Sequence, residues 1–209
     1  MLLTKYEHAC FTVEKDGQIL IVDPGGFSSD FIAPDHVAGV IVTHEHSDHF
    51  DHEQLAAILD KNPEAVIIGP ASVISQVEVF ETKPATTGDI IKLGPFTLEF
   101  FGGEHATIHS SLPSIANLGV LINDLLYYPG DSFATPNRPI DTLALPVAAP
   151  WLKISEVMDY LTRVHPRLAF PTHDAILSDI GKEITDARLL ATANARDILY
   201  QRLTTQIDI

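Results

Sequence analysis

The sequence has a single cysteine, Cys10, and no apolar run that approaches the roughly 18 residues needed to span a bilayer. One cysteine rules out a disulfide framework within the chain, and its place in the apolar stretch 9–13 predicts a small buried side chain. The first residues, MLLTKYEH, lack the charged end and long apolar centre of a signal peptide. We therefore expect a cytoplasmic protein that has no membrane partner.

Basic residues are also scarce, because 13 Lys and Arg stand against 28 Asp and Glu and the formal net charge is -15 at pH 7. A protein that binds nucleic acid through the phosphate backbone needs a broad basic face. We therefore expect a small-molecule substrate and no nucleic acid, and leave a homo-oligomer open. A chain of 209 residues, 45% of them hydrophobic, can bury the core of one domain spanning 1–209.

The densest group of polar side chains is the stretch 43–51, THEHSDHFD, directly after the apolar run 39–42. A β-branched run with such an ending predicts a buried strand that leads into a loop. Side chains alternate along an extended backbone, so His44 and His46 point the same way, whereas the adjacent Asp48 and His49 can face a second position. Imidazole and carboxylate ligands suit Zn²⁺, Mn²⁺, Ni²⁺ or Fe²⁺. The stretch therefore predicts two metal positions.

The spacing His44-x-His46-x-Asp48-His49 resembles the signature of the metallo-β-lactamase superfamily. This resemblance implies an α+β fold, namely a four-layer αββα sandwich of two mixed sheets with outer helices. The hydrophobic pattern agrees, because it predicts strands through most of the chain and helices over 52–60, 71–80, 154–164 and 184–203. Two pairs of segments are also alike, 19–25 with 125–131 and 40–44 with 169–173, which favours two similar halves.

Three later segments match further ligand positions of the superfamily. The strand 97–101 is followed by Gly-Gly-Glu and His105, with His109 as the competing ligand, and the segments Gly-Asp-Ser and Pro-Thr-His supply Asp131 and His173. The resemblance implies that one metal is held by three histidines, the other by a carboxylate and two histidines, and that one aspartate bridges them. These ligands are His44, His46 and His105 for the first metal, Asp48, His49 and His173 for the second, and Asp131 between them.

Four other residues are candidates to line the pocket or to support the ligands: His8, Asp23, His109 and Trp151. Asp23 ends the strand 18–22 before Pro-Gly-Gly, where the resemblance implies a carboxylate behind the ligands, and a turn-forming role is the alternative. The glycines there would let the backbone pass close to the metals. His8 stands in an opening like the Gly-His-Ala of one branch, except that Glu7 replaces the glycine, so a pocket role and a structural role both stay open.

The expected activity follows from the ligands. Two divalent cations about 3.5–4 Å apart can share one hydroxide and lower the pKa of its water to about 7. The sequence therefore predicts a dinuclear metal-dependent hydrolase that uses a metal-bridging hydroxide on a small ester, lactone or phosphoester. Asp48 is the expected catalytic residue, because it can orient that nucleophile. Zinc is the expected metal, with manganese, nickel or iron as alternatives.

Two other functions compete with this one: a phosphodiesterase or nuclease acting on nucleotides or RNA, and a non-hydrolytic metal-binding protein such as a regulator or a flavodiiron-like redox protein. Within the superfamily, the compact chain most resembles the small hydrolases related to ascorbate-6-phosphate lactonase and to N-acyl-phosphatidylethanolamine phospholipase D. The commonest class B β-lactamases carry a cysteine where this chain has Asp131, so the resemblance points away from antibiotic hydrolysis.

Overall fold

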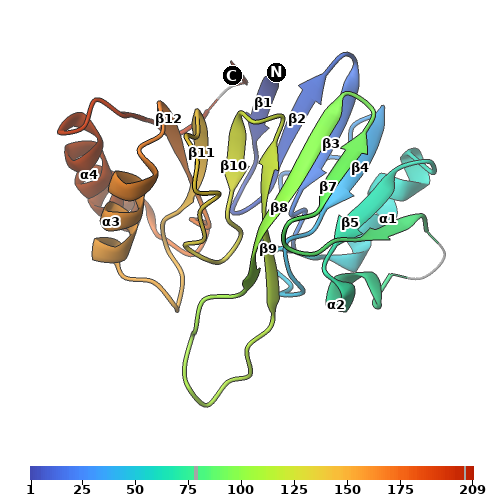
Figure 1. Cartoon of the computed structure of the whole chain (residues 1–209), viewed down its shortest axis with the longest axis horizontal. Helices are drawn as coiled ribbons and strands as arrows, with labels where there is room; N and C mark the ends of the chain where they lie inside the picture. Colours follow the sequence, from blue (N-terminus) through green and yellow to red (C-terminus); the bar gives the residue numbers. More distant parts are fainter. Residues whose placement is uncertain (78–79, 205) are drawn as a thin grey trace.

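The computed structural model describes residues 1–77, 80–204 and 206–209. Two seven-stranded sheets lie face to face, and helices cover the outer face of each (Figure 1). The first sheet has the order β14-β1-β2-β3-β4-β5-β6, with β1 Leu2–Lys5, β2 Phe11–Lys15, β3 Gln18–Val22, β4 Val37–Ile41, β5 Val66–Gly69, β6 Thr82–Pro84 and β14 Ile207–Asp208. The second has the order β13-β12-β11-β10-β9-β8-β7, with β7 Ile90–Leu93, β8 Phe96–Glu104, β9 Ala116–Ile122, β10 Leu126–Tyr128, β11 Thr142–Pro146, β12 Leu168–Thr172 and β13 Leu199–Tyr200.

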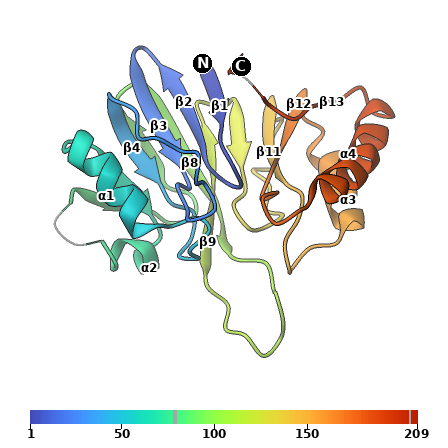
Figure 2. The same cartoon turned by 180° about the vertical axis from the view of Figure 1, so that it is seen from behind.

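Both sheets are mixed in the same way. An antiparallel pair, β2 with β3 and β9 with β10, leads into a run of parallel strands. The helices are α1 His52–Lys61 and α2 Ala71–Ile74 on the first sheet, and α3 Ile154–Val164 and α4 Asp179–Asn194 on the second (Figure 2). The predicted four-layer αββα sandwich is confirmed.

The core has three layers, which explains why the central strands read as continuous apolar runs. Along β3, Leu20 and Val22 pack into the cluster between the two sheets, whereas Ile21 faces the cluster beneath α1. Along β10, Tyr128 points between the sheets and Tyr127 points towards α3 and α4. Side chains alternate along a strand, so a strand that is covered on both faces is apolar at every position.

The helix α1 begins as the sequence predicts. The Asp51 carboxylate accepts a hydrogen bond from the backbone amide of Gln54 at 2.9 Å, which caps the helix directly after the metal-binding stretch. Leu55, Ile58 and Leu59 form its buried face. The cap therefore fixes where the loop 43–51 ends and the helix starts.

Two predicted helices have the wrong extent. The predicted helix 71–80 ends at Ile74, and residues 78 and 79 lie outside the described part of the chain. The Ser75 hydroxyl donates to the carbonyl of Ser72 at 3.0 Å, a local bond that competes with helix continuation. The predicted helix therefore gives way to a single turn.

The predicted helix 184–203 is observed as α4, over residues 179–194. It begins earlier because the Ser178 hydroxyl caps it by accepting from the amide of Gly181. It ends earlier because the chain reverses at Asp197, which has a φ of 55°, and residues 199–200 then pair with β12 as strand β13. Apolar residues of this short edge strand had continued the helical pattern by coincidence.

The likeness between the halves is only partly structural. β3 and β10, which end at 22 and 128, hold equivalent places in the two sheets. The segments 40–44 and 169–173 do not, because β4 is the second parallel strand of its sheet and β12 is the third of its own.

Among the described residues, the helices are all too short or too polar to cross a membrane.

Candidate metal centre

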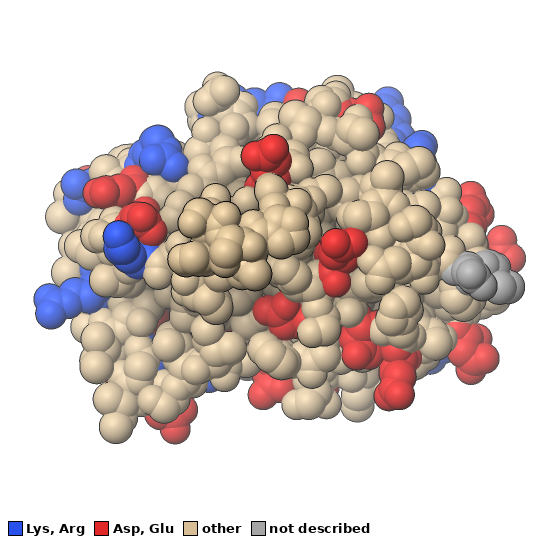
Figure 3. All heavy atoms as spheres, turned by 90° about the horizontal axis from the view of Figure 1, so that it is seen from below, with Lys and Arg blue, Asp and Glu red and all other residues tan. Residues whose placement is uncertain are grey.

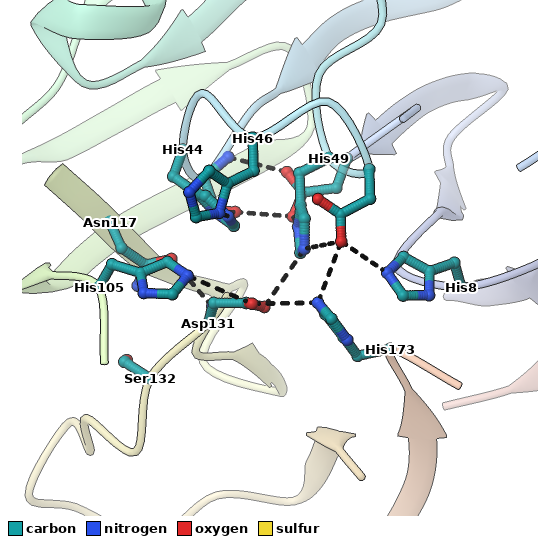
Figure 4. Close-up of polar contacts among 12 residues, drawn as sticks. His8, His44, His46, His49, His105, Asn117, Asp131, Ser132 and His173 are labelled. Carbon is teal, nitrogen blue, oxygen red and sulfur yellow. Dashed lines mark hydrogen bonds and ion pairs between the residues drawn. The ribbon is translucent and has the colours of Figure 1, made fainter. Parts of the chain in front are cut away.

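The loop 43–51 lies against the end of β3 at the edge where strands of both sheets terminate (Figures 1 and 4). A Cβ atom at residue 25 would lie 1.9 Å from the carbonyl oxygen of Asp48, so glycine is the only residue type that fits at this position. Gly25 therefore permits a close approach between the backbone after β3 and the loop 43–51. It fixes the position of Asp48 and of the next residue, His49.

The first group of ligands consists of His44, His46 and His105, whose ligand atoms lie within 4.8 Å of one another. His44 Nε2 is 3.1 Å from His46 Nδ1. His105 follows β8 directly and donates its Nδ1 hydrogen to the carbonyl of Ala106 at 2.6 Å. Because the proton is then on Nδ1, the lone pair of Nε2 faces the other two histidines.

The second group contains Asp48, His49 and His173, together with His8, again within 4.8 Å. His173 donates from Nδ1 to the carbonyl of Ala148 at 2.5 Å, which turns its Nε2 lone pair inward. His8 differs. It is fully buried, its Nδ1 accepts from the amide of Ala175, and its Nε2 therefore donates to Asp48 Oδ2 at 3.0 Å. His8 thus acts as a donor that orients Asp48 rather than as a ligand.

Asp131 lies between the two groups (Figure 4). Its Oδ1 is 3.2 Å from His49 Nε2, and its Oδ2 is 3.0 Å from His173 Nε2 and 3.4 Å from His105 Nε2. The indole of Trp151 donates to the same Oδ2 at 2.8 Å. The carboxylate therefore faces both sets of histidines, as a bridging ligand must.

Asp23 lies behind the ligands and connects to both groups. It is fully buried, and its Oδ2 accepts from His49 Nδ1 at 2.7 Å and from the Thr43 hydroxyl at 2.7 Å. The Thr43 oxygen is in turn 3.0 Å from His44 Nδ1, which donates to it because the hydroxyl hydrogen is already used. One carboxylate therefore sets the tautomers of His49 directly and of His44 through a hydroxyl.

The donor set fits metal ions. Buried polar atoms in proteins almost always have hydrogen-bond partners. Within the described residues, four buried atoms that face one another in this cluster have none. These atoms are His49 Nε2, His105 Nε2, His173 Nε2 and Asp131 Oδ1. They approach one another without hydrogen-bond geometry, as ligands of common cations do.

The charges of the cluster point the same way. Burial lowers the pKa of His44 well below its usual value, so this imidazole is neutral at physiological pH. Burial opposes the charge of Asp131, but the neighbouring imidazole of His49 outweighs it and holds the pKa of the carboxyl well below its usual range. Burial likewise lowers the pKa of His173, but the neighbouring carboxylates of Asp131 and Asp48 outweigh this and raise it to about 9. In the metal-free protein, a proton on a histidine such as His173 therefore balances the carboxylate charge that a bound cation can balance instead.

A pocket of about 290 Å³ opens over the cluster, and Asp48, Asp131, Pro150 and Trp151 are among its walls. The Asp48 side chain is 19% exposed, whereas that of His49 is completely buried. Asp48 is therefore, with the partly exposed His46, a candidate ligand that a molecule in this pocket can contact.

Comparisons with known proteins agree with this geometry. A family model described as a β-lactamase superfamily domain matches residues 2–173. The chain belongs to the metallo-β-lactamase superfamily. Protein Rv0786c of Mycobacterium tuberculosis is 35% identical over 209 residues, which cover 98% of this chain and 92% of that protein. The resemblance inferred from the histidine motif is confirmed.

Solved structures of the metallo-β-lactamase fold show the same architecture. The metallo hydrolase Igni18 from Ignicoccus hospitalis superposes with a TM-score of 0.77 at 17% identity, over 100% of this chain and 98% of that one. The metallo-β-lactamase fold protein YhfI from Bacillus subtilis gives a TM-score of 0.73 at 16% identity, over 99% and 98%. At these identities the likeness concerns the fold.

The structure brings together all seven ligands that the superfamily resemblance implies. Of the two competing histidines, His105 lies in the cluster, whereas His109 is exposed on the loop beyond it and bonds to the hydroxyl of Ser111. Of the four supporting candidates, His8, Asp23 and Trp151 contact ligands, and His109 lines a neighbouring pocket.

Sequence reasoning missed two supporting residues of this superfamily site. These are Thr43, in the histidine motif, and Asn117, in β9. The Asn117 amide donates to the carbonyl of Pro129 and accepts from the backbone amide of Asp131, both at 2.9 Å, so it fixes the turn that carries the bridging aspartate. The available signal in the sequence was an asparagine directly before the apolar run 118–122.

Proposed function

We propose that this protein is a dinuclear metal-dependent hydrolase of small esters, lactones or phosphoesters. The observation that carries the proposal is the meeting of two ligand groups at Asp131, with inward-facing imidazole nitrogens and an open pocket above them. A catalytic metal site differs from a structural one by such an accessible side. Zinc is the expected metal, with manganese, nickel or iron as alternatives. The cytoplasm is the expected location of the protein.

Two divalent cations held by these residues supply Lewis acidity and an activated water at neutral pH. The first group, His44, His46 and His105, would hold one cation, and Asp48, His49 and His173 would hold the other, with Asp131 contacting both. No serine or cysteine nucleophile is then needed, which agrees with Cys10 being buried.

Asp48 is the residue that we assign to proton movement. Its carboxylate is partly exposed to the pocket, and its Oδ2 accepts from His8 Nε2 at 3.0 Å. That bond fixes the orientation of the carboxylate, so Asp48 can accept a hydrogen bond from a water in the pocket and take up its proton as the oxygen of the water bonds to the substrate; the proton then passes to the leaving group. Trp151 and Pro150 cover the side of Asp131 and limit the access of bulk water to the reacting atoms.

Metal analysis combined with a substrate panel tests the proposal. The purified protein should contain about two divalent ions per chain and should hydrolyse at least one of p-nitrophenyl acetate, a γ-lactone and bis(p-nitrophenyl) phosphate. His49→Ala and Asp131→Ala should lower both the metal content and the rate. His52→Ala, at an exposed histidine in the first turn of α1, is the matched control and should change neither. A fully metallated and active Asp131→Ala protein would contradict the ligand assignment.

A further inference from the structure

A second pocket lies beside the metal centre, beneath the loop that connects β8 to β9. Its volume is about 370 Å³, and its walls include His46, His105, Ile108, Leu112, Pro113 and Ile115. His46, His105 and Ile108 also line the pocket over the ligands, so the two spaces adjoin each other at these residues. The loop projects beyond the lower edge of both sheets (Figures 1 and 2).

The base of this loop is tied to the site. The amide of Ala106 donates to the carbonyl of Asp131 at 2.8 Å, and the amide of His105 donates to the carbonyl of Ile115 at 3.0 Å. The first and last residues of the loop are therefore held at the bridging aspartate and at a metal-binding histidine. The pocket walls keep a defined place relative to the reacting atoms.

The surface of the loop pocket is mostly apolar, although the hydroxyl-bearing residues Thr107, Ser110 and Ser114 also line it. Among the described residues, its lining and that of the adjoining space over the ligands contain no lysine or arginine. In the space-filling view of this face, the middle shows red side chains among tan ones and little blue (Figure 3). An anionic group on the part of the substrate that enters this pocket would thus meet no lysine or arginine side chain. Its burial would therefore be unfavourable.

Apolar side chains are exposed on the same loop. Ile108 is 39% exposed and Leu112 is 52% exposed, although both lie next to a polar metal centre. Within the site, exposed apolar groups beside convergent polar ones are typical of a substrate pocket. A volume of 370 Å³ is near the lower end of the roughly 300–1,000 Å³ found for small-molecule sites, which suits one short to medium chain.

We propose that the loop pocket binds the uncharged acyl chain of an ester or lactone whose carbonyl group lies over the metal centre. This inference rests on the proposed hydrolase function and narrows its substrate class to neutral, apolar esters and lactones. In the reaction, the oxygen of water joins the acyl carbon and the acyl C–O bond breaks. One proton of the water goes to the leaving alcohol, and the other is released when the product carboxylic acid ionises.

A series of p-nitrophenyl esters tests the pocket with the metal-loaded protein. A fully buried methylene is worth roughly fourfold in binding, and the walls here are half exposed, so we expect kcat/KM to rise about twofold per methylene from acetate through butyrate to hexanoate. Ile108→Ser should remove most of this rise, so that kcat/KM for hexanoate falls about tenfold more than kcat/KM for acetate. Ile180→Ser, at a 69% exposed isoleucine on α4, is the matched control and should leave the series unchanged.

A binding measurement separates this inference from the hydrolase function. Trp151 is the only tryptophan of the chain, and its ring lies 6.2 Å from that of His105, so its fluorescence reports on the site. Hexanamide, which is uncharged, should bind more tightly than acetamide, and Ile108→Ser should abolish the difference. If no ester is cleaved but this difference is seen, the loop pocket stands and the hydrolase proposal fails. If esters are cleaved at rates independent of chain length, the hydrolase proposal stands and the loop pocket is wrong.

Discussion

Replacing Asp23 with asparagine tests how the ligands are held. In the native arrangement Asp23 Oδ2 accepts from both His49 Nδ1 and the Thr43 hydroxyl, and Oδ1 accepts from the Thr43 amide at 2.8 Å. An asparagine that keeps the bond to the amide must place its NH₂ group where Oδ2 stood. That group donates, so His49 Nδ1 has to accept, and the imidazole proton moves to Nε2, where it blocks metal binding.

The magnitude follows from the number of ligands that depend on this carboxylate. Loss of one hydrogen-bond partner behind a metal ligand typically lowers metal affinity by about 10–100-fold. Asp23→Asn disturbs His49 directly and His44 through the Thr43 hydroxyl, so we expect both ions to bind more weakly. For the second ion, the one held by the group that contains His49, the affinity should fall by about 100-fold, or roughly 2.8 kcal/mol. Thr43→Val removes the hydroxyl that links Asp23 to His44 but leaves the bond between Asp23 and His49 Nδ1, so it should weaken binding of the first ion by about tenfold and affect the second much less.

Zinc titration of the metal-free protein against a competing chelator, followed by Trp151 fluorescence, gives the two affinities. Asp51→Asn is the matched control, because it removes a nearby negative charge and asparagine still caps α1. Circular dichroism of each metal-free variant shows that it is folded. Wild-type affinity for both ions in Asp23→Asn would refute the reasoning.

Three further predictions concern single residues. His105→Ala should lower the metal content to roughly half, because one of two ligand groups is lost, and His109→Ala should leave it unchanged; elemental analysis decides, and the reverse pattern would exchange their roles. A hydrogen bond from the Arg167 guanidinium lowers the pKa of Asp141. This depressed pKa stabilises the fold above the unfolded pKa of about 3.9, and the contribution is lost as the pH falls through the lower folded value. For this exposed pair, Asp141→Asn should therefore cost less than about 1 kcal/mol at neutral pH, and in urea unfolding the difference should shrink under acid conditions, not grow. Burial raises the pKa of the Cys10 thiol, so a thiol reagent at mildly alkaline pH should react after unfolding in urea, and rapid labelling of the native protein would contradict this.

Much of the fold could be predicted because its signals are local. The alternation along the strands, the Asp51 cap and the apolar face of α1 are each set by neighbouring residues. The short edge strands could not be predicted in this way. Leu199 and Tyr200 form a strand only because β12 is present beside them, and Ser178 determines the start of α4 through a single hydroxyl.

The residues of the site likewise differ in whether local sequence signals could predict them. The candidate ligands of the stretch 43–51, such as His44, could be predicted from residue type and spacing after a strand, whereas later ones, such as Asp131, were implied by the superfamily resemblance. The supporting contacts depend on side chains far apart in the sequence, such as His8 with Asp48, 40 residues away, and could only be suspected. The loop pocket had no sequence signal, since apolar residues such as Ile108 in a loop are common and acquire meaning only beside the metal centre.

The ligands come from loops of both sheets: the stretch 43–51 follows a strand of the first, whereas His105, Asp131 and His173 follow strands of the second. Any cation bound there ties the two layers together, so each ion adds to resistance against unfolding by mass action. Without bound metal, the protein should unfold locally at this edge of the sheets more often and should be degraded faster. The cellular abundance of this protein would then track the supply of its metal, even with its synthesis unchanged.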